Sequence, residues 1–286
     1  MQQPAWTHHY RTINGFTMHY VTAGTGPALV LVHGWPQSWY EWRHLIPSLA
    51  EHFTVIAPDL RGLGDSGKPL TGYDKRTLAG DVHALVKELG FDSIGLVGHD
   101  WGGAVCYHLC YDYPGFVERL MIFDMVPGLF RKGQPLELER ATRLWHVFWH
   151  GAQPDLAETM VRKDPEAYIR FFLTSPWYNY SPAVFSEEDI REYVRVFNLP
   201  GTIRAGFQYY ANALRQDAED LAACTEKLAM PVRVWGGQAG MDNVVPVWQA
   251  VAENVSGGVV PECGHFIPEE KPEFALRELE DFFTAT

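Results

Sequence analysis

The sequence has few cysteines, and it lacks the patterns that mark a metal centre, a disulfide framework or a membrane segment. Cys106, Cys110, Cys224 and Cys263 form no Cys-x-x-Cys pair and no Cys/His metal spacing. No apolar run reaches the length of a membrane span. The first ten residues lack the basic-then-apolar pattern of a signal peptide, which predicts a cytoplasmic protein unless a leader has been removed. We expect no metal and no organic cofactor.

Positive charge is also scarce. The chain has 23 Lys and Arg against 35 Asp and Glu, a formal net charge of −12. Nucleic acids and anionic membranes are therefore poor partners, and we expect a small-molecule partner and a monomer or homodimer. The 286 residues are 47% hydrophobic and 20% charged, which suits one α/β domain or a core with an insert.

Strand-like and helix-like segments alternate through the first part of the chain. The strand-like runs are 16–24, 28–34, 53–59, 93–100 and 119–125, and several are continuously apolar, as in strands buried on both faces. Between them, 38–51 and 78–90 have helical spacing, and Gly90 is a plausible stop for the second helix. This alternation predicts an α/β fold with a mostly parallel sheet and helices on both faces.

The pattern changes after Pro127. Residues 128–222 have helical spacing, many aromatic residues and no convincing strand. Strand-like runs return at 231–237 and 257–265, and a helix closes the chain.

We therefore predict an α/β core of residues 1–127 and 223–286 that is interrupted by a helical cap, residues 128–222. The expected place for the cap is over the carboxyl ends of the strands, where open α/β sheets bind ligands. Trp145, Trp177 and Tyr178 of the insert are candidate contacts for the substrate.

The stretch GHDWGG, residues 98–103, has the layout of the G-x-S-x-G nucleophile elbow, with Asp100 in place of serine. A serine that attacked a saturated carbon would form an ether, which water does not readily cleave. An aspartate forms an ester, and water then attacks the carbonyl of the aspartate and regenerates the carboxylate. Asp100 therefore suits displacement at a tetrahedral carbon, in an epoxide ring or bearing a halogen, rather than ester or amide hydrolysis.

The second step needs a base that activates water, and His265 fits this role. It follows the last predicted strand and comes after the nucleophile, as in the α/β-hydrolase order of nucleophile, acid and histidine. His108, His146 and His150 have no comparable context, and we interpret them as packed or solvated side chains.

Two aspartates are candidates for the acid that orients His265. Asp124 ends the strand-like run 119–125, and Asp242 lies in the loop after 231–237. We favour Asp124, because it stands at a strand end and the loop before Asp242 is long; Asp242 remains the alternative. The oxyanion of ester cleavage needs two backbone N–H donors, which we assign to Trp101 and to Trp35 of the HGWP motif.

Four motifs together, HGWP, DLRGLGDSGKP, GHDWGG and CGHFIPEE, resemble the α/β-hydrolase superfamily in its epoxide hydrolase and dehalogenase branch. The phrases FTVIAPDL, VFSEEDI, FQYYANAL and PECGHFIPEE are most similar to bacterial epoxide hydrolases of the Cif-like group. The resemblance implies the α/β-hydrolase fold and an orienting acid at the Asp124 position, where glutamate is usual.

The resemblance also implies cap residues that hydrogen-bond the epoxide oxygen, usually two tyrosines or a histidine and a tyrosine. Tyr210 matches the family's ring-opening tyrosine, and its spacing places it with Ile203, Phe207 and Leu214 on one helix face, unlike Tyr209. The segment TSPWYNYSP loosely matches the second donor, with Trp177, Tyr178 and Tyr180 as candidates.

Two alternatives to epoxide hydrolysis stay open. Haloacetate dehalogenases carry arginines where this chain has Trp101 and Ala104, and the tryptophan of their halide pocket falls near Val147, so haloacetate is disfavoured. Dehalogenation of a neutral haloalkane remains possible through the indole of Trp101. A non-catalytic ligand-binding protein is the other alternative, since some members of the fold are receptors. The prediction is an epoxide hydrolase that makes vicinal diols through an aspartyl ester.

Overall fold

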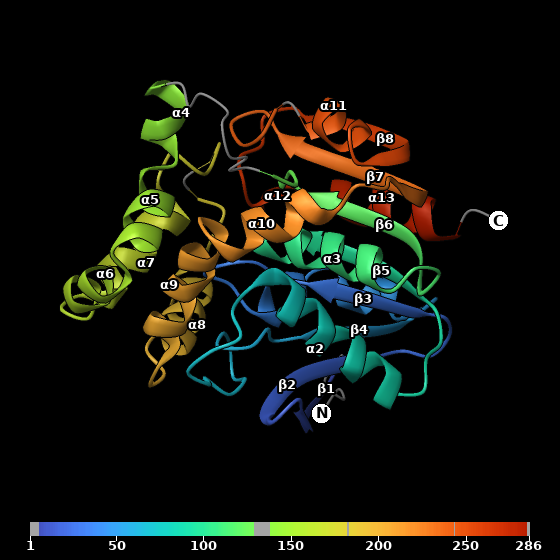
Figure 1. Cartoon of the computed structure of the whole chain (residues 1–286), viewed down its shortest axis with the longest axis horizontal. Helices are drawn as coiled ribbons and strands as arrows, with labels where there is room; N and C mark the ends of the chain where they lie inside the picture. The colour runs from blue at the N-terminus through green and yellow to red at the C-terminus, as the bar shows by residue number, and fades with distance from the viewer. Residues whose placement is uncertain (1–5, 129–137, 182, 243, 285–286) are drawn as a thin grey trace.

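The structure is a computed structural model that describes residues 6–128, 138–181, 183–242 and 244–284. Its centre is an eight-stranded sheet in the order β1-β2-β4-β3-β5-β6-β7-β8 (Figure 1). The strands are β1 Thr7–Ile13, β2 Phe16–Ala23, β3 Ala28–Val32, β4 Thr54–Pro58, β5 Ile94–His99, β6 Val117–Phe123, β7 Leu228–Gly237 and β8 Ala252–Val260. The β1–β2 and β2–β4 pairs are antiparallel and the others are parallel, so the mostly parallel sheet is confirmed.

Helices cover both faces of the sheet, and β3 shows why. Its five residues are all buried, and successive side chains point to opposite faces. Val30 and Val32 join the cluster that includes residues of α2 (Lys75–Glu88) and α3 (Trp101–Asp112). Leu29 and Leu31 pack with residues of α1 (Ile46–Leu49) and α13 (Pro272–Thr284). A strand buried on both faces thus holds two helical layers together.

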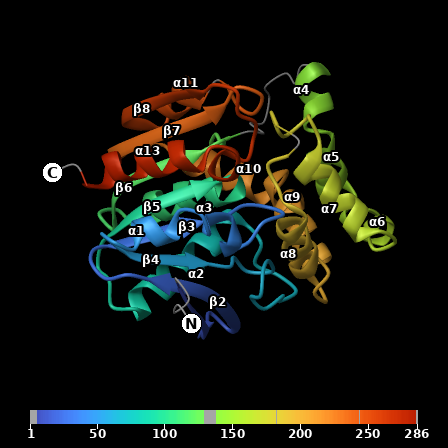
Figure 2. The ribbon, with the colours of Figure 1, turned by 180° about the vertical axis from the view of Figure 1, so that it is seen from behind.

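The described helices between β6 and β7 form the cap. They are α4 Leu138–Arg143, α5 Trp145–Ala152, α6 Pro154–Val161, α7 Pro165–Thr174, α8 Glu187–Phe197, α9 Thr202–Ala213 and α10 Gln216–Ala223. Local signals start several of them: Asp164 caps α7, and Ser186 and Asp189 form a capping box at α8. Figures 1 and 2 show α4 to α9 gathered at one end of the sheet.

One local prediction is wrong, and one strand was missed. The segment 38–51 is not one helix: a 3-10 turn, η1 (Trp39–Trp42), is followed by the separate helix α1, which begins next to Pro47. Proline lacks the N–H that a continuous helix needs, so a new helix begins there. The sequence analysis also missed β1, because this edge strand is largely exposed and lacks apolar alternation.

Two short helices follow the last two strands. α11 (Val244–Gln249) packs on β7 and β8, and α12 (Ile267–Glu270) follows the loop after β8.

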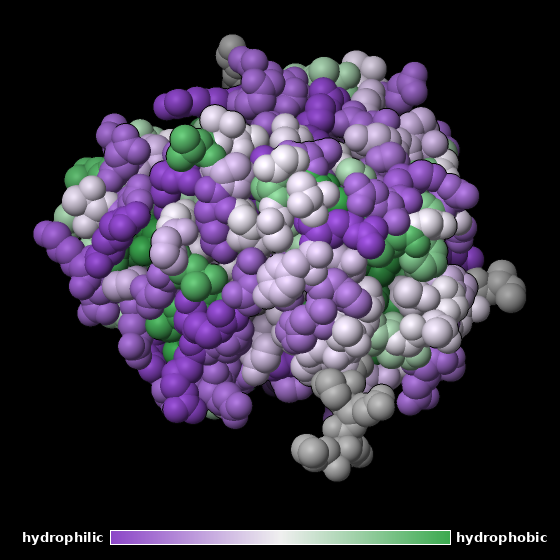
Figure 3. All heavy atoms as spheres, turned by 90° about the horizontal axis from the view of Figure 1, so that it is seen from below, coloured by the Kyte–Doolittle hydropathy of each residue, from purple (hydrophilic) through white to green (hydrophobic). Residues whose placement is uncertain are grey.

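Within the described residues, no helix is both long enough and apolar enough to cross a membrane. On the face seen in Figure 3, hydrophilic side chains predominate and hydrophobic residues form small separate patches.

Candidate active site

Asp100 occupies a sharp turn between β5 and α3. Its φ of 49° and ψ of −130° place it in a region that aspartate rarely adopts, which holds its side chain at the end of the sheet. Neighbouring glycines make room for the turn. A Cβ on Gly34 would lie 2.4 Å from Cβ of Asp100, and one on Gly102 would lie 2.2 Å from the carbonyl oxygen of Val32. The elbow predicted from GHDWGG is therefore present.

The predicted base and nucleophile lie next to each other. Nε2 of His265 is 3.5 Å from Oδ2 of Asp100. The backbone N–H of His265 donates to the carbonyl oxygen of Tyr178, which ties the base to the cap (2.6 Å). On the other side of the ring, Nδ1 of His265 lies 2.6 Å from Oδ2 of Asp124.

The two candidate acids differ in position. Asp124 is 1% exposed, and its Oδ1 accepts the backbone N–H groups of Gly237 and Met241, each at 2.8 Å. Asp242 is exposed at the edge of the cavity, and the structure gives it no contact with His265. The structure thus brings Asp124, the favoured candidate, to the imidazole.

The predicted oxyanion donors face the nucleophile. The backbone N–H of Trp35 donates to Oδ1 of Asp100 at 2.8 Å. The backbone N–H of Trp101 also contributes to lowering the pKa of Asp100. Oδ1 therefore accepts the Trp35 N–H, while Oδ2 lies on the side of His265.

The charges of the site depend on one another. Burial alone would raise the pKa of Asp100, but the hydrogen bond and charge of His265 outweigh burial and hold it below its usual range. Burial alone would lower the pKa of His265, but its hydrogen bonds to Asp100 and Asp124 raise it to about 10. The resting pair is thus a carboxylate and an imidazolium.

A cavity of about 570 Å³ opens between the sheet and the cap. Its lining contains Trp35, Asp100, Trp101, Asp124, His265, Tyr210, Trp177, Tyr178 and Asp242, together with apolar side chains such as Met125, Val126, Leu144, Val147, Phe172, Met241 and Val247. The predicted substrate contacts Trp177 and Tyr178 are therefore at the cavity.

Trp145 does not itself line the cavity. It is 37% exposed, stacks on Trp149 and Phe172, and hydrogen-bonds the side chain of Tyr178, so its contact with substrate stays a prediction. Tyr180 is not in the lining either. Its side chain is half exposed, and its backbone N–H donates to the carboxylate of Glu270.

Tyr210 lies between the two tryptophans of the site. Its ring makes edge contacts with Trp35 and Trp101, at centroid distances of 5.3 and 5.2 Å. Tyr209 is also buried, but its hydroxyl donates to the carbonyl oxygen of Arg61, away from the cavity. The helix-face argument thus separates the two tyrosines by direction, although both are buried.

The sequence analysis missed His146. This residue lines the cavity, and its Nδ1 lies 3.0 Å from the hydroxyl of Tyr178. Burial lowers the pKa of His146 to about 3 and raises that of Tyr178 to about 12, so both groups are neutral near pH 7. His146, interpreted from its sequence context as a packed or solvated side chain, is therefore packed at the cavity wall and becomes a candidate site residue.

Arg143 was not anticipated either. It lines the cavity edge, and its guanidinium donates to the carbonyl oxygens of Ala239 and Gly240. These bonds join α4 to the loop after β7. The guanidinium group of Arg143 is thus hydrogen-bonded to backbone carbonyl groups.

One group of potential metal ligands lies elsewhere among the described residues: His19, Asp59 and Asp65 have ligand atoms within 4.8 Å of one another. Asp59 already accepts the N–H groups of Trp39 and Asp65 and pairs with His19, and Asp65 pairs with Arg195. These partners account for the arrangement without an ion.

Comparison with known proteins agrees with this geometry. Residues 27–272 match the α/β hydrolase fold family, and the chain belongs to that family. It is 58% identical to the soluble epoxide hydrolase of Corynebacterium sp. strain C12, over 97% of both chains. The ligand-free structure of epoxide hydrolase CorEH superposes with a TM-score of 0.96, covering 97% of this chain and 98% of that one at 58% identity.

A more distant relative represents the alternative chemistry. The chain is 29% identical to the fluoroacetate dehalogenase of a Burkholderia species, over 95% of this chain and 92% of that protein. The predicted fold and the assignment to the epoxide hydrolases are confirmed by the nearer relatives.

Proposed function

We propose that this protein hydrolyses neutral epoxides to vicinal diols through an ester on Asp100. The observation that carries the proposal is the environment of the carboxylate. Asp100 lines the cavity, its Oδ1 accepts the N–H of Trp35, and its Oδ2 lies 3.5 Å from Nε2 of His265. A nucleophile, its base and an oxyanion site thus meet at one carboxylate.

In the first step, Oδ2 of Asp100 attacks an epoxide carbon and the C–O bond of the ring breaks. The alkoxide that leaves must receive a proton. Tyr210 and Tyr178 present phenol groups from the cap, and burial raises the pKa of both, so both stay protonated. We assign Tyr210 as one donor and Tyr178, with its partner His146, as the second.

In the second step, His265 takes a proton from water, and the hydroxide attacks the ester carbonyl. The esterified Asp100 no longer carries a charge, so the imidazolium loses one of the two carboxylates that raise its pKa. His265 can then return its proton to the tyrosinate left by ring opening and act as a base. The N–H groups of Trp35 and Trp101 receive the oxyanion. When the intermediate collapses, the ester C–O bond breaks and the imidazolium gives the proton taken from water to the departing alkoxide, which frees the diol and regenerates the Asp100 carboxylate.

The cavity favours a small substrate without charge. Apolar and aromatic side chains provide most of its wall, and Arg143 is bound to two carbonyl groups. Burial of an unpaired substrate carboxylate beside Asp100 would be costly. A monomeric or homodimeric state and a cytoplasmic location stay predictions.

Dehalogenation of neutral haloalkanes is a second candidate function. Trp35 and Trp101 line the cavity, and an indole N–H is a donor suited to a halide ion. The same attack by Asp100 would then release halide instead of opening a ring.

A substrate panel tests the proposal. Small, aromatic and long-chain epoxides, haloalkanes and fluoroacetate would be incubated with the wild type and with Asp100→Ala, and diol and halide would be measured. We expect diol from epoxides with the wild type and none above background with the variant. Efficient fluoride release from fluoroacetate, or full epoxide turnover by Asp100→Ala, would contradict the proposal.

A further inference from the structure

Lys75 is a buried cation that the proposed mechanism does not use. It is the first residue of α2 and is 1% exposed. A lysine is almost never fully buried unless it is paired, because a buried charge is costly. Its partners therefore indicate what it does.

The ammonium group has three partners. It donates to the carbonyl oxygen of Tyr209 at 2.6 Å and pairs with Oδ2 of Asp217 on α10 at 2.8 Å. It also lies 4.2 Å from the centre of the Trp101 ring, in cation–π contact. Lys75 thus joins the elbow helix α3 to the last two cap helices.

Two of these partners lie next to Tyr210 in the wall of the cavity. The carbonyl of Tyr209 directly precedes Tyr210, the proposed proton donor, and the ring of Trp101 packs edge-on against the ring of Tyr210. One ammonium group therefore holds the backbone before the donor and the indole against which the donor packs. A small displacement of a reacting group is expensive in rate.

The charge of Lys75 is consistent with this arrangement. Burial lowers the pKa of Lys75, while Asp217, Asp100 and Asp74 favour its charged form. The interaction with Asp100 means that the cation lies within electrostatic reach of the nucleophile. The atoms used in the second step, those of His265 and the N–H groups of Trp35 and Trp101, have no hydrogen bond with Lys75 in the described structure.

The geometry points to Lys75 as a positioning residue for ring opening, which acts through Trp101 and the Tyr209–Tyr210 backbone. The inference rests on the proposed function. We expect removal of the ammonium group to slow formation of the ester and to leave hydrolysis of the ester nearly unchanged.

The test compares both steps in Lys75→Met, which keeps the length and apolar stem of the side chain. Ester formation and decay would be followed by rapid quenching and intact mass in single turnovers with a neutral epoxide. We expect ester formation to slow by roughly 10- to 100-fold, the scale of a misplaced reacting group. The double variant Lys75→Met/Asp217→Asn restores charge balance, so it should recover thermal stability but not the rate of ester formation.

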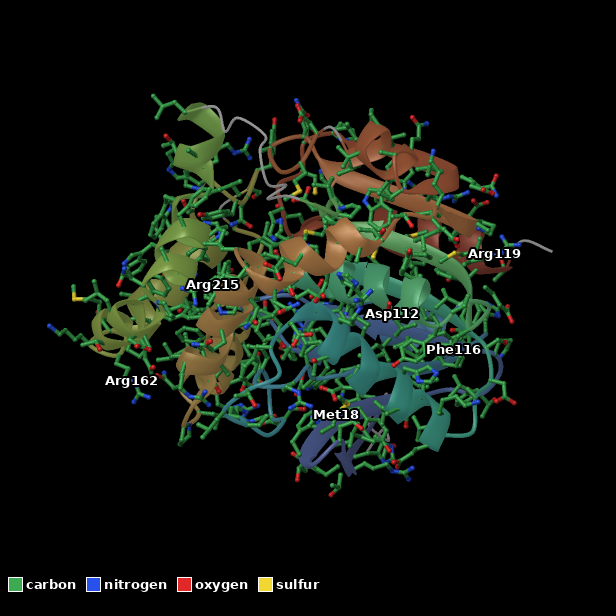
Figure 4. All side chains as sticks on the ribbon, viewed as in Figure 1. Met18, Asp112, Phe116, Arg119, Arg162 and Arg215 are labelled. Carbon is green, nitrogen blue, oxygen red and sulfur yellow. The ribbon has the colours of Figure 1, made fainter. Side chains whose placement is uncertain are left out.

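Arg76→Met is the matched control. Arg76 is the next residue of α2 and also joins α3 to α10, through Asp112 at the end of α3 (Figure 4) and Asp220 on α10. Its partners are therefore not the Trp101 ring or the Tyr209 carbonyl that Lys75 contacts. Both steps should keep their rates in this variant. Unchanged ester formation in Lys75→Met and in the double variant, equal slowing of both steps, or the same defect in Arg76→Met would overturn the inference. Absence of an ester in the wild type would instead contradict the proposed function.

Discussion

Two aspartates of the site share one chemistry and differ in surroundings. Asp124 is saturated by Gly237, Met241 and His265, so its carboxylate has no free direction for attack. Asp100 accepts the Trp35 N–H at Oδ1, has Oδ2 beside Nε2 of His265 and lines the cavity. Surroundings, rather than residue type, thus divide the roles into nucleophile and orienting acid.

The two candidate acids can be separated by mutation. Asp124→Asn should slow ester hydrolysis by roughly 10³–10⁴-fold, the scale seen when an orienting carboxylate is neutralised, because the imidazolium loses its partner. Asp242→Asn should leave hydrolysis unchanged, because Asp242 is exposed at the cavity edge. Single-turnover decay of the ester measures both, and the reverse ranking would move the role to Asp242.

The pKa of His265 should depend on the charge of Asp100. Asp100→Asn removes one of the carboxylates that raise this pKa to about 10, so the pKa should fall, as it must in the ester. An NMR titration of the imidazole measures the shift. A pKa that stayed at the wild-type value in the variant would refute the proposed switch from imidazolium to base.

Sequence reasoning worked best where local chain geometry determines the site. Asp100, Asp124 and His265 all follow parallel strands, whose carboxyl ends meet at one edge of the sheet. His146 gave no such signal, because its place depends on how α5 packs against α9 and on the position of Tyr178. Residue spacing favoured Asp124 but left Asp242 open, because the position of Asp242 depends on the course of the loop after β7.

At the scale of elements, the cap helix α9 supplies the proposed proton donor, which distinguishes epoxide opening from dehalogenation. It carries Tyr210 into the cavity and turns Tyr209 toward Arg61. The apolar spacing along 203–214 predicts this difference, since residues three and four apart share a helix face. The position of Trp145 behind the cavity lining depends on its contacts with Trp149 and Phe172, which residue spacing does not contain.

Tyr210→Phe separates the two candidate activities. Ester formation from an epoxide should slow by roughly 10²–10⁴-fold if Tyr178 does not compensate, because the alkoxide loses a proton donor. Ester formation from a haloalkane should change much less, since a halide leaves without a proton. Parallel single-turnover assays of both substrates give the comparison, and an unchanged epoxide rate would remove Tyr210 from the mechanism.

At the scale of the whole molecule, the sheet and cap form because strand and helix periods alternate along the chain. The buried strands β3 to β6 are readable as short apolar runs, and the described cap helices follow a change to helical spacing. The exposed edge strand β1 carried no such pattern. Edge elements and the short η1–α1 pair are set by contacts across the sheet, which a local pattern does not contain.

The pH dependence of folding stability should reflect the active site. The pKa of His265 is about 6.5 unfolded and about 10 folded, so its stabilisation is fully present below about pH 6.5 and is lost as the pH rises through about 10. The melting temperature of the wild type should therefore fall more steeply between these values than that of His265→Gln. Parallel slopes in thermal melts would contradict the raised pKa.

The central claim is that Asp100 forms a covalent ester that His265 resolves, and one mass measurement tests it most directly. His265→Gln keeps the nucleophile and removes the base, so on mixing with a neutral epoxide the protein should gain the mass of one epoxide. Peptide mapping should place this mass on Asp100, and Asp100→Asn should gain none. A variant that gained no mass while turning over epoxide normally, or that carried the mass elsewhere, would contradict the account.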